Sequence, residues 1–343
     1  MIILTESEIR SLVGHAEASE AVAAAFRALH AEAVAVPEPW HIGLGDGESE
    51  VHCKSAYVRG AASWSIKVSS TFYANHDDGK PALSGLIMLF DARTGVPSAL
   101  LLDNGYLTEL RTGAAGTLSV ELLARPDARR VAVLGAGSQA RYQLASLAGK
   151  RDVASVAVAS RSRDGAERLA SWWRQHHGCP IEICESVEAA VEHADIVFAT
   201  TPASEPILAG ACLAPGTHIV AVGADSLGKR ELDRAVFERA AVVAVDHVGQ
   251  ATALGETRSA LEDGAIQVQD LVTLGALVAG QAAGRVSPDQ ITVADLTGIG
   301  AQEAVLGERL LSAAKERGLG AEFVSPNVSL EGVVALPPFS SRG

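Results

Sequence analysis

Residues 131–140 of this 343-residue chain read VAVLGAGSQA and are the strongest indication of its fold. A short apolar run leads directly into a G-x-G-x-x-A pattern made by Gly135, Gly137 and Ala140. Such glycines let the backbone turn tightly and approach a pyrophosphate, and the amides of the following helix donate hydrogen bonds to it. A glycine-rich structural turn would give the same letters. Because a strand, a helix and a second strand (Val153–Ala159) are all expected in the required order, we predict a dinucleotide site.

The end of the second strand bears on which dinucleotide binds. A site for NAD usually has an acidic residue there, whereas this chain has Ser160, Arg161, Ser162 and Arg163. Guanidinium and hydroxyl groups suit a 2′-phosphate, so the sequence favours NADP and leaves NAD open. In the alternative, Ser162 caps the next helix and both arginines are solvated. The residues expected to contact the cofactor are Gly135, Gly137, Ser138, Gln139, Ala140, Ser160, Arg161, Ser162, Arg163, Thr200 and Thr201.

Strands and helices alternate from residue 130 onward. Apolar strands that alternate with helices are typical of a parallel, doubly wound α/β sheet. The strands are expected at Arg130–Leu134, Val153–Ala159, Ile181–Cys184, Ile196–Thr200, His218–Val222, Val242–Val245 and Gln290–Asp295. The helices are expected at Gln139–Ala148, Gly165–Gln175 and Gln302–Arg317.

The first hundred residues have a different pattern. Apolar spacing predicts a helix over Glu6–Ala33, with Thr5 as its N-cap. Strand-like runs separated by turn signals then indicate a mixed or antiparallel sheet; they are Glu50–Val58, Trp64–Ser70, Ser84–Phe90 and Ser98–Asp103. A helix of small residues is expected from Thr112. We predict a mixed α+β domain of residues 1–117 and 303–343, with a nucleotide domain of residues 118–302 inserted in it.

Composition limits the partners. The charge sum is 28 − 41 = −13 and the isoelectric point is about 5.2, so polyanions such as nucleic acid or an anionic membrane surface would be repelled on average. The start of the chain does not resemble a targeting signal, and no apolar run approaches the roughly 20 residues of a membrane helix. A cytoplasmic protein is therefore expected. The four cysteines form no CxxC pair, and His176 and His177 lie in a polar stretch, so no metal site is predicted.

Four motifs in order along the chain carry a family resemblance. They are residues 66–116 (IKVSSTF to LRTGAAG), LGAGSQA, VGADSLGKREL and DLTGIGAQEAV. Together they resemble the ornithine cyclodeaminase/mu-crystallin family nearly end to end. LLDNGYLTELRT and DLTGIGAQE are most similar to the cyclodeaminase-like proteins of ectoine-utilisation operons and to imine reductases such as iminosuccinate reductase. The resemblance implies a homodimer in which a Rossmann domain that binds NAD(P) is inserted into a substrate and dimerisation domain.

The resemblance also assigns roles to single residues. Lys67 matches the family's active-site lysine, which would donate a hydrogen bond or proton at an imine. Arg111 matches the arginine that binds the substrate carboxylate, although a helix-terminal salt bridge would explain it too. Asp225 matches an acidic residue that acts as base or water activator, and a turn aspartate is its alternative. Thr297 and Gly298 match the loop that approaches the nicotinamide.

Two departures from the family pattern affect the expected substrate. Where many members have a second arginine, this chain has Trp40 and His41. Lys54 replaces the glutamate of ornithine cyclodeaminases, and a lysine suits an acid or a neutral group rather than an amine. With His52 nearby, the pocket would suit a small acidic imine such as iminosuccinate, unless Lys54 points to solvent.

The sequence therefore predicts an NAD(P)H-dependent imine reductase, or an amino-acid dehydrogenase in reverse, that acts on a small α-imino acid. Two alternatives stay open at this point. One is a cyclodeaminase (an ammonia-lyase) that uses bound NAD⁺ transiently, and the other is a non-catalytic ligand-binding protein like mu-crystallin.

Overall fold

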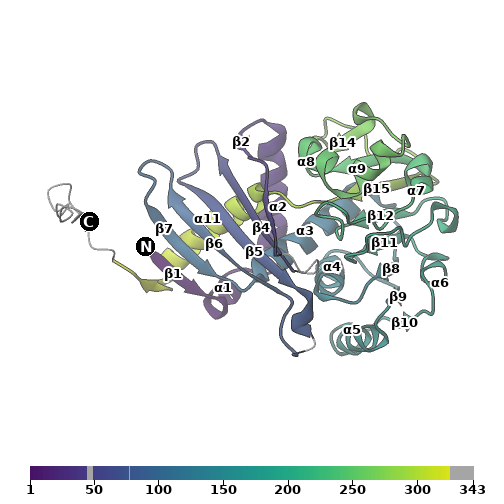
Figure 1. Ribbon diagram of the computed structural model, residues 1–343, viewed down its shortest axis with the longest axis horizontal. Helices are drawn as coiled ribbons and strands as arrows, with labels where there is room; N and C mark the ends of the chain where they lie inside the picture. Colours follow the sequence, from purple (N-terminus) through teal and green to yellow (C-terminus); the bar gives the residue numbers. More distant parts are fainter. Residues whose placement is uncertain (45–48, 77, 325–343) are drawn as a thin grey trace, which may run out of the picture.

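Two sheets placed side by side organise the protein (Figure 1). The computed structural model describes residues 1–44, 49–76 and 78–324. One sheet is mostly antiparallel, and the other is parallel throughout its described length. The predicted fold class, a doubly wound parallel sheet joined to a mixed α+β unit, is confirmed. Within the described residues, no helix is long and apolar enough to cross a bilayer.

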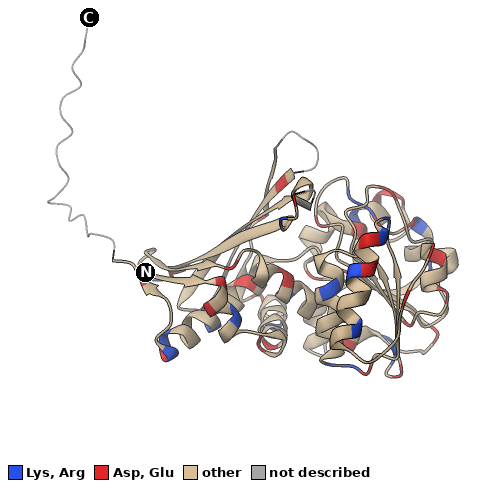
Figure 2. Ribbon diagram, turned by 90° about the horizontal axis from the view of Figure 1, so that it is seen from below, with Lys and Arg blue, Asp and Glu red and all other residues tan. Residues whose placement is uncertain are grey.

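The mixed sheet is built from the N-terminal residues and one late strand. Its order is β16-β1-β7-β6-β5-β4-β2, and β3 pairs with β4 along the same edge as β2. The bounds of its strands are β1 Ile2–Thr5, β2 Val34–Ala35, β3 Trp40–Gly43, β4 Ser49–Val58, β5 Ser63–Phe72, β6 Leu83–Asp91, β7 Pro97–Leu102 and β16 Ala321–Glu322. A short 3₁₀ helix, Tyr73–His76, follows β5. Helices α1 (Glu6–Leu12), α2 (His15–His30) and α11 (Gly300–Arg317) lie on one face, whereas the other face is open (Figure 2).

The parallel sheet has the order β10-β9-β8-β11-β12-β15-β13-β14. The strand order reverses between β8 and β11, which is where open α/β sheets bind nucleotides. Its strands are β8 Arg130–Leu134, β9 Ser155–Ala159, β10 Ile181–Ile183, β11 Ile196–Ala199, β12 His218–Ala221, β13 Ala240–Val245, β14 Leu271–Thr273 and β15 Ile291–Asp295. The flanking helices are α4 Ser138–Ala148, α5 Arg163–His176, α6 Val187–Val191, α7 Arg234–Arg239, α8 Val248–Ala253, α9 Gly255–Glu262 and α10 Leu274–Val278, with 3₁₀ turns at Gly210–Cys212 and Val268–Asp270.

Helix α3, Tyr106–Leu123, joins the two halves and is buried along almost its whole length. It packs against α2 and α11 on one side and against α4, β12 and β15 on the other. The boundaries expected at 117/118 and 302/303 fall inside α3 and α11, so the structure has continuous helices at both crossings. The residues 325–343 assigned to the first domain lie outside the described part of the chain.

Two details of the predicted helices are corrected. The helix predicted over Glu6–Ala33 is broken at Val13 and Gly14 into α1 and α2. Thr5 does cap α1, and its hydroxyl and backbone amide make a capping box with Glu8. The helix expected from Thr112 begins six residues earlier, at Tyr106.

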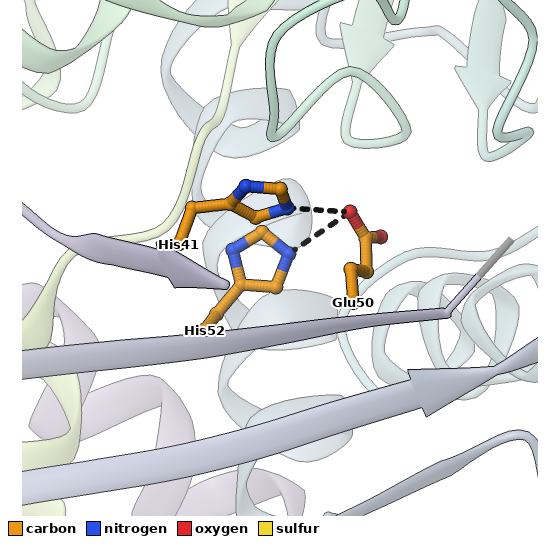
Figure 3. A group of neighbouring side chains, drawn as sticks. All are labelled: His41, Glu50 and His52. Carbon is orange, nitrogen blue, oxygen red and sulfur yellow. Dashed lines mark hydrogen bonds and ion pairs between the residues drawn. The ribbon is translucent and has the colours of Figure 1, made fainter. Parts of the chain in front are cut away.

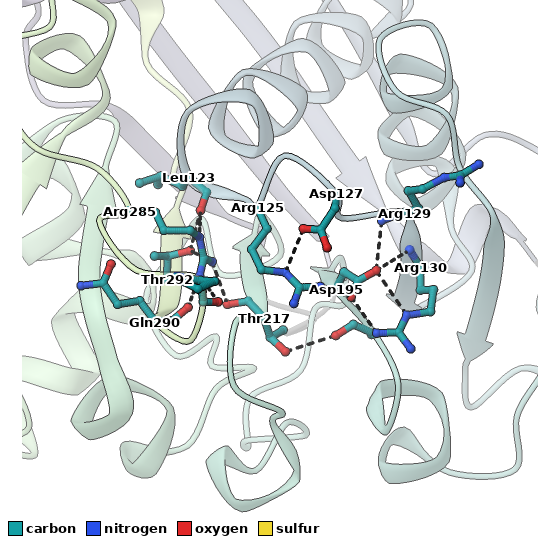
Figure 4. A network of polar contacts seen from close by, with 12 residues as sticks. Leu123, Arg125, Asp127, Arg129, Arg130, Asp195, Thr217, Arg285, Gln290 and Thr292 are labelled. Carbon is teal, nitrogen blue, oxygen red and sulfur yellow. Dashed lines mark hydrogen bonds and ion pairs between the residues drawn. The ribbon is translucent and has the colours of Figure 1, made fainter.

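A polar network fixes the amino-terminal edge of the parallel sheet (Figure 4). The Asp195 carboxylate accepts hydrogen bonds from the side chains of Arg125 (2.6 Å) and Arg130 (2.8 Å) and from two backbone amides. Burial alone would raise the pKa of Asp195, but Arg130 and the two backbone amides lower it to about 2. Arg285 donates to the Leu123 carbonyl (2.7 Å) and ties the end of α3 to the same edge. The carboxyl-terminal edge of the sheet does not take part in this network, and it is the edge at which open α/β sheets bind ligands.

Candidate active site

A cavity of about 1590 Å³ lies between the two sheets. It is larger than the roughly 300–1,000 Å³ of an ordinary small-molecule pocket, so a dinucleotide and a small substrate fit together. The predicted residues that line it are Arg111, Gly135, Gly137, Ser138, Gln139, Ser160, Arg161, Ser162, Thr200, Thr201, Asp225, Thr297 and Gly298. The other predicted residues are not part of the lining: His52, Lys54, Lys67 and Ala140 are buried, and Arg163 is exposed.

The loop after β8 has the form that a pyrophosphate requires. Gly135 has φ +103°, and a Cβ there would lie 2.8 Å from the Thr200 hydroxyl. A Cβ at Gly137 would meet nothing within 4 Å, so this glycine leaves open space beside the backbone. Gly137 is also the N-cap of α4 and offers no side-chain acceptor to the first-turn amides. Those amides and the helix dipole can therefore hold an anion, and the residues present fit a dinucleotide.

The residues at the end of β9 divide between two environments. Ser160, Arg161 and Ser162 line the cavity. The Ser162 hydroxyl also accepts the Gly165 amide at 3.0 Å and caps α5. Arg163 lies outside the cavity wall, where its Nε contacts Glu167 at 3.1 Å on the surface. Of the two arginines, only Arg161 therefore lines the cavity.

A buried ion cluster stands at the mixed-sheet side of the cavity. Lys67 Nζ lies 2.8 Å and Arg111 Nε 2.9 Å from the same atom, Oε1 of Glu303. Lys67 is 2% exposed and Glu303 is fully buried. Burial is the main reason that the pKa of Lys67 lies below its usual range, and Glu303 opposes this shift. Burial would raise the pKa of Glu303, but Arg111 and Lys67 lower it to about 2, so the carboxylate stays ionised.

Arg111 retains free hydrogen-bonding capacity on the cavity side. It lies in the second turn of α3, and its Nη1 donates to Gln302 Oε1 at 3.1 Å. Within the part of the chain that the structure describes, Nη2 donates to no protein acceptor. A Cβ on Gly298 would lie 2.5 Å from Nη1, so the loop after β15 approaches the guanidinium as closely as only glycine allows. Arg111 can therefore receive a carboxylate from the cavity.

Lys54 faces neither solvent nor the cavity. Its ammonium donates to the backbone carbonyls of Thr297 (2.8 Å) and Gly298 (2.9 Å). Burial, with Lys67 and Arg111 nearby, lowers the pKa of Lys54 to about 7. Gln250 donates to the same loop, and Asp246 accepts from the Gly298 amide at 2.6 Å. Lys54 thus fixes the predicted nicotinamide loop, and the solvent-exposed alternative is wrong.

Asp225 belongs to a chain of charges at the cavity mouth. Its carboxylate lies 2.8 Å from Lys229 Nζ, which also lies 2.7 Å from Glu50 Oε1. Burial would raise the pKa of Asp225, but Lys229, His52 and Lys54 together lower it well below its usual range. Asp225 is therefore ionised and can hold a cation or orient a water molecule. His52 stands behind Glu50, with Nε2 3.3 Å from Glu50 Oε2.

The sequence analysis missed four side chains of this site: Glu303, Glu109, Lys229 and Glu50. Glu109 is buried and accepts hydrogen bonds from Ser138 and Gln139 beside the glycine loop. Glu303, Glu109 and Lys229 lie within motifs that the sequence analysis quoted, whereas Glu50 does not. The sequence could not indicate their contacts because residues such as Lys67 and Glu303 are far apart along the chain.

Known proteins resemble the chain over nearly its whole length. The family model described as "Ornithine cyclodeaminase/mu-crystallin family" matches residues 1–315. The chain belongs to this family. An uncharacterized cyclodeaminase of Sinorhizobium fredii is 38% identical, with 95% of this chain and 99% of that protein covered.

Solved structures of the family have the same fold. The Δ¹-pyrroline-2-carboxylate reductase of Thermococcus litoralis, in complex with NADH and L-proline, superimposes with a TM-score of 0.88 and is 28% identical over 94% of this chain and 100% of that one. An archaeal alanine dehydrogenase dimer with bound NAD has a TM-score of 0.87 and 29% sequence identity, with 94% of this chain and 99% of that chain covered. For the iminosuccinate reductase of Paracoccus denitrificans with NAD⁺, the TM-score is 0.84 and the identity is 29%, with 93% of this chain and 97% of that chain covered.

Proposed function

We propose that the chain is an NAD(P)H-dependent imine reductase that converts a small α-imino acid to the amino acid. The observation that carries the proposal is the Lys67–Glu303–Arg111 cluster, which stands across one cavity from a pyrophosphate-type glycine loop. The reductases and the dehydrogenase that resemble it act on this substrate class and contain NAD(H). A bound reduced nicotinamide supplies the hydride that adds to the α-carbon.

Residues of the chain supply the remaining chemistry. The free edge of Arg111 binds the α-carboxylate and fixes the position of the imine carbon. As the C=N electron pair moves to nitrogen, Lys67 donates the proton that completes the amine, and its lowered pKa favours that transfer. Glu303 keeps both cations in place, and Asp225 orients water or the incoming ammonium at the mouth.

The charges of the cavity wall favour a substrate with one carboxylate. Lys229 is already paired with Asp225 and Glu50, Arg10 with Glu6, and Lys80 with Asp78. Lys54, expected from the sequence to receive a second acid group, is held by backbone carbonyls. We therefore propose a monocarboxylic imine in preference to iminosuccinate.

The test is NADPH and NADH oxidation against a panel of imines. Cyclic imines, keto acids with ammonia or methylamine, and oxaloacetate with ammonia belong in the panel. Sustained cofactor oxidation with Δ¹-pyrroline-2-carboxylate or another monocarboxylic imine is the expected result. Ammonia release from a diamino acid without net cofactor oxidation would establish the cyclodeaminase alternative. Tight cofactor binding with no turnover of any substrate would favour a ligand-binding protein.

We propose NADP as the preferred cofactor, although the similar structures contain NAD or NADH. The support is Arg161 with two serines at the end of β9, where an acidic residue would select NAD. Fluorescence titration should give tighter binding of NADPH than NADH, and Arg161→Ala should remove the difference. Tighter binding of NADH by the wild type would refute the preference.

We propose that the open face of the mixed sheet forms a homodimer interface. Among the described residues, no helix covers this face (Figure 2). The alternating burial along β5 and β6 directs a row of apolar side chains to it: Trp64, Ile66, Val68, Met88 and Phe90. Trp64 and Phe90 stack with centroids 4.2 Å apart, and a similar alanine dehydrogenase is a dimer. Light scattering should give twice the chain mass, and Ile66→Glu should give a monomer. The division into residues 1–117 with 303–343 and 118–302, and the cytoplasmic location, stay predictions.

A further inference from the structure

Three potential metal ligands meet where β3 pairs with β4. His41 is the direct cross-strand partner of His52, and such partners point to the same face of a sheet. Glu50 lies two residues before His52 on β4, and the two-residue period of a strand places it on that face too. Figure 3 shows a ring nitrogen of each imidazole directed at the same oxygen of the Glu50 carboxylate.

The three ligand atoms lie within 4.8 Å of one another, and the two separations from Glu50 match those of a metal's ligands. The Nε2 atoms of His41 and His52 each lie 3.3 Å from Glu50 Oε2. Two ligands bound at roughly 2.0–2.1 Å to a tetrahedral ion lie roughly 3.3 Å apart. The His52 side chain is 8% exposed, and its buried Nε2 faces Glu50 Oε2 at 3.3 Å without making a well-aligned hydrogen bond to any described residue. A buried nitrogen that is directed at the group but lacks an aligned hydrogen bond points to a ligand.

The surrounding charges leave room for a cation. Glu50 Oε1 lies 2.7 Å from Lys229, and the Ser226 hydroxyl lies 3.3 Å from Oε2. Lys229 shares its one positive charge between Glu50 and Asp225. These two carboxylates and one ammonium sum to −1. A divalent ion on Oε2 would reverse that charge without displacing Lys229, which occupies the other oxygen.

We propose that His41, Glu50 and His52 bind a divalent first-row transition ion such as Zn²⁺ at the mouth of the cavity. Two imidazoles and one carboxylate are ligands that this class of ion prefers, and three protein ligands leave a coordination position open. The side chain of His41 is 47% exposed and gives the ion a path from solvent. The proposal does not depend on imine reduction, and it replaces the sequence-based expectation of no metal site.

The test is titration of the metal-free full-length protein with ZnCl₂ by calorimetry and with CoCl₂ by visible absorption. One equivalent per chain should bind. His41→Gln and His52→Gln should each weaken the binding by at least ~100-fold, because the loss even of an outer-shell partner costs 10–100-fold. His176→Gln is the matched control, since it removes an exposed imidazole on α5 and should leave the affinity unchanged.

Circular dichroism and dinucleotide binding establish that each variant is folded. His41 is the decisive position if the buried His52 variant misfolds, because its exposed side chain is not part of the core. No binding to the wild type would overturn the proposal. Stoichiometric binding that His41→Gln leaves intact would overturn it as well.

Discussion

The substitution Glu303→Gln tests the centre of the proposed site. It removes one negative charge and keeps the shape of a side chain that contacts Lys67 at 2.8 Å and Arg111 at 2.9 Å. At an effective dielectric constant near 20, each of these contacts corresponds to about 6 kcal/mol of Coulomb attraction. The net loss in Glu303→Gln is smaller than this attraction for two reasons. The glutamine amide oxygen still accepts hydrogen bonds, and the variant no longer bears the free-energy cost of burying a carboxylate. Removing one partner of a buried pair typically costs about 3–5 kcal/mol.

Thermal unfolding of the ligand-free protein should therefore show a melting temperature lower by roughly 4–7 °C. Glu303 raises the pKa of Lys67, so its loss should move the alkaline limb of the kcat/KM profile to lower pH. Glu316→Gln makes the same charge change at an exposed site on α11 and is the control. If both variants melt at the wild-type temperature and share its pH profile, Glu303 is not the counter-ion of the two cations.

Three further outcomes follow from the same contacts. Lys67→Met should lower kcat by at least ~100-fold and leave NADPH affinity unchanged, as separate turnover and fluorescence measurements would show. Gly298→Ala should lower kcat/KM by roughly 100-fold, since its Cβ would displace Arg111; Gly264→Ala, with a similar positive φ but open space, should not. The folded-state pKa of Lys54 is about 7 against 10.5 when unfolded, so the folded chain binds fewer protons between these values. The free energy of unfolding in urea, taken as wild type minus Lys54→Met, should therefore rise between pH 7 and 10.5 by up to about 1.4 kcal/mol per pH unit. A difference that does not change with pH would contradict the burial of the Lys54 amine.

Local sequence signals located most of the parallel sheet. The strands at Arg130–Leu134 and Ile196–Ala199 and the helix at Gly300–Arg317 lie within two residues of their expected bounds, because buried strands and amphipathic helices carry strong hydrophobic patterns. Short elements such as α8 and β3 were missed. Helices of five or six residues have too few turns to show a period, and β3 is recognisable only through its pairing with β4.

The family, the doubly wound sheet and the glycine loop could be predicted from the sequence, because they depend on patterns within short stretches of chain. The family resemblance also singled out Lys67 and Arg111, although not the group that holds them. Three contacts appear only in the folded chain: Glu303 joins these two cations, Lys54 donates to the Thr297–Gly298 loop, and His41 pairs with His52. Lys67 and Glu303 are separated by 236 positions, so their contact is created by the packing of α11 on the sheet. The interaction between two charges depends on their separation in space, and the sequence alone does not give that separation.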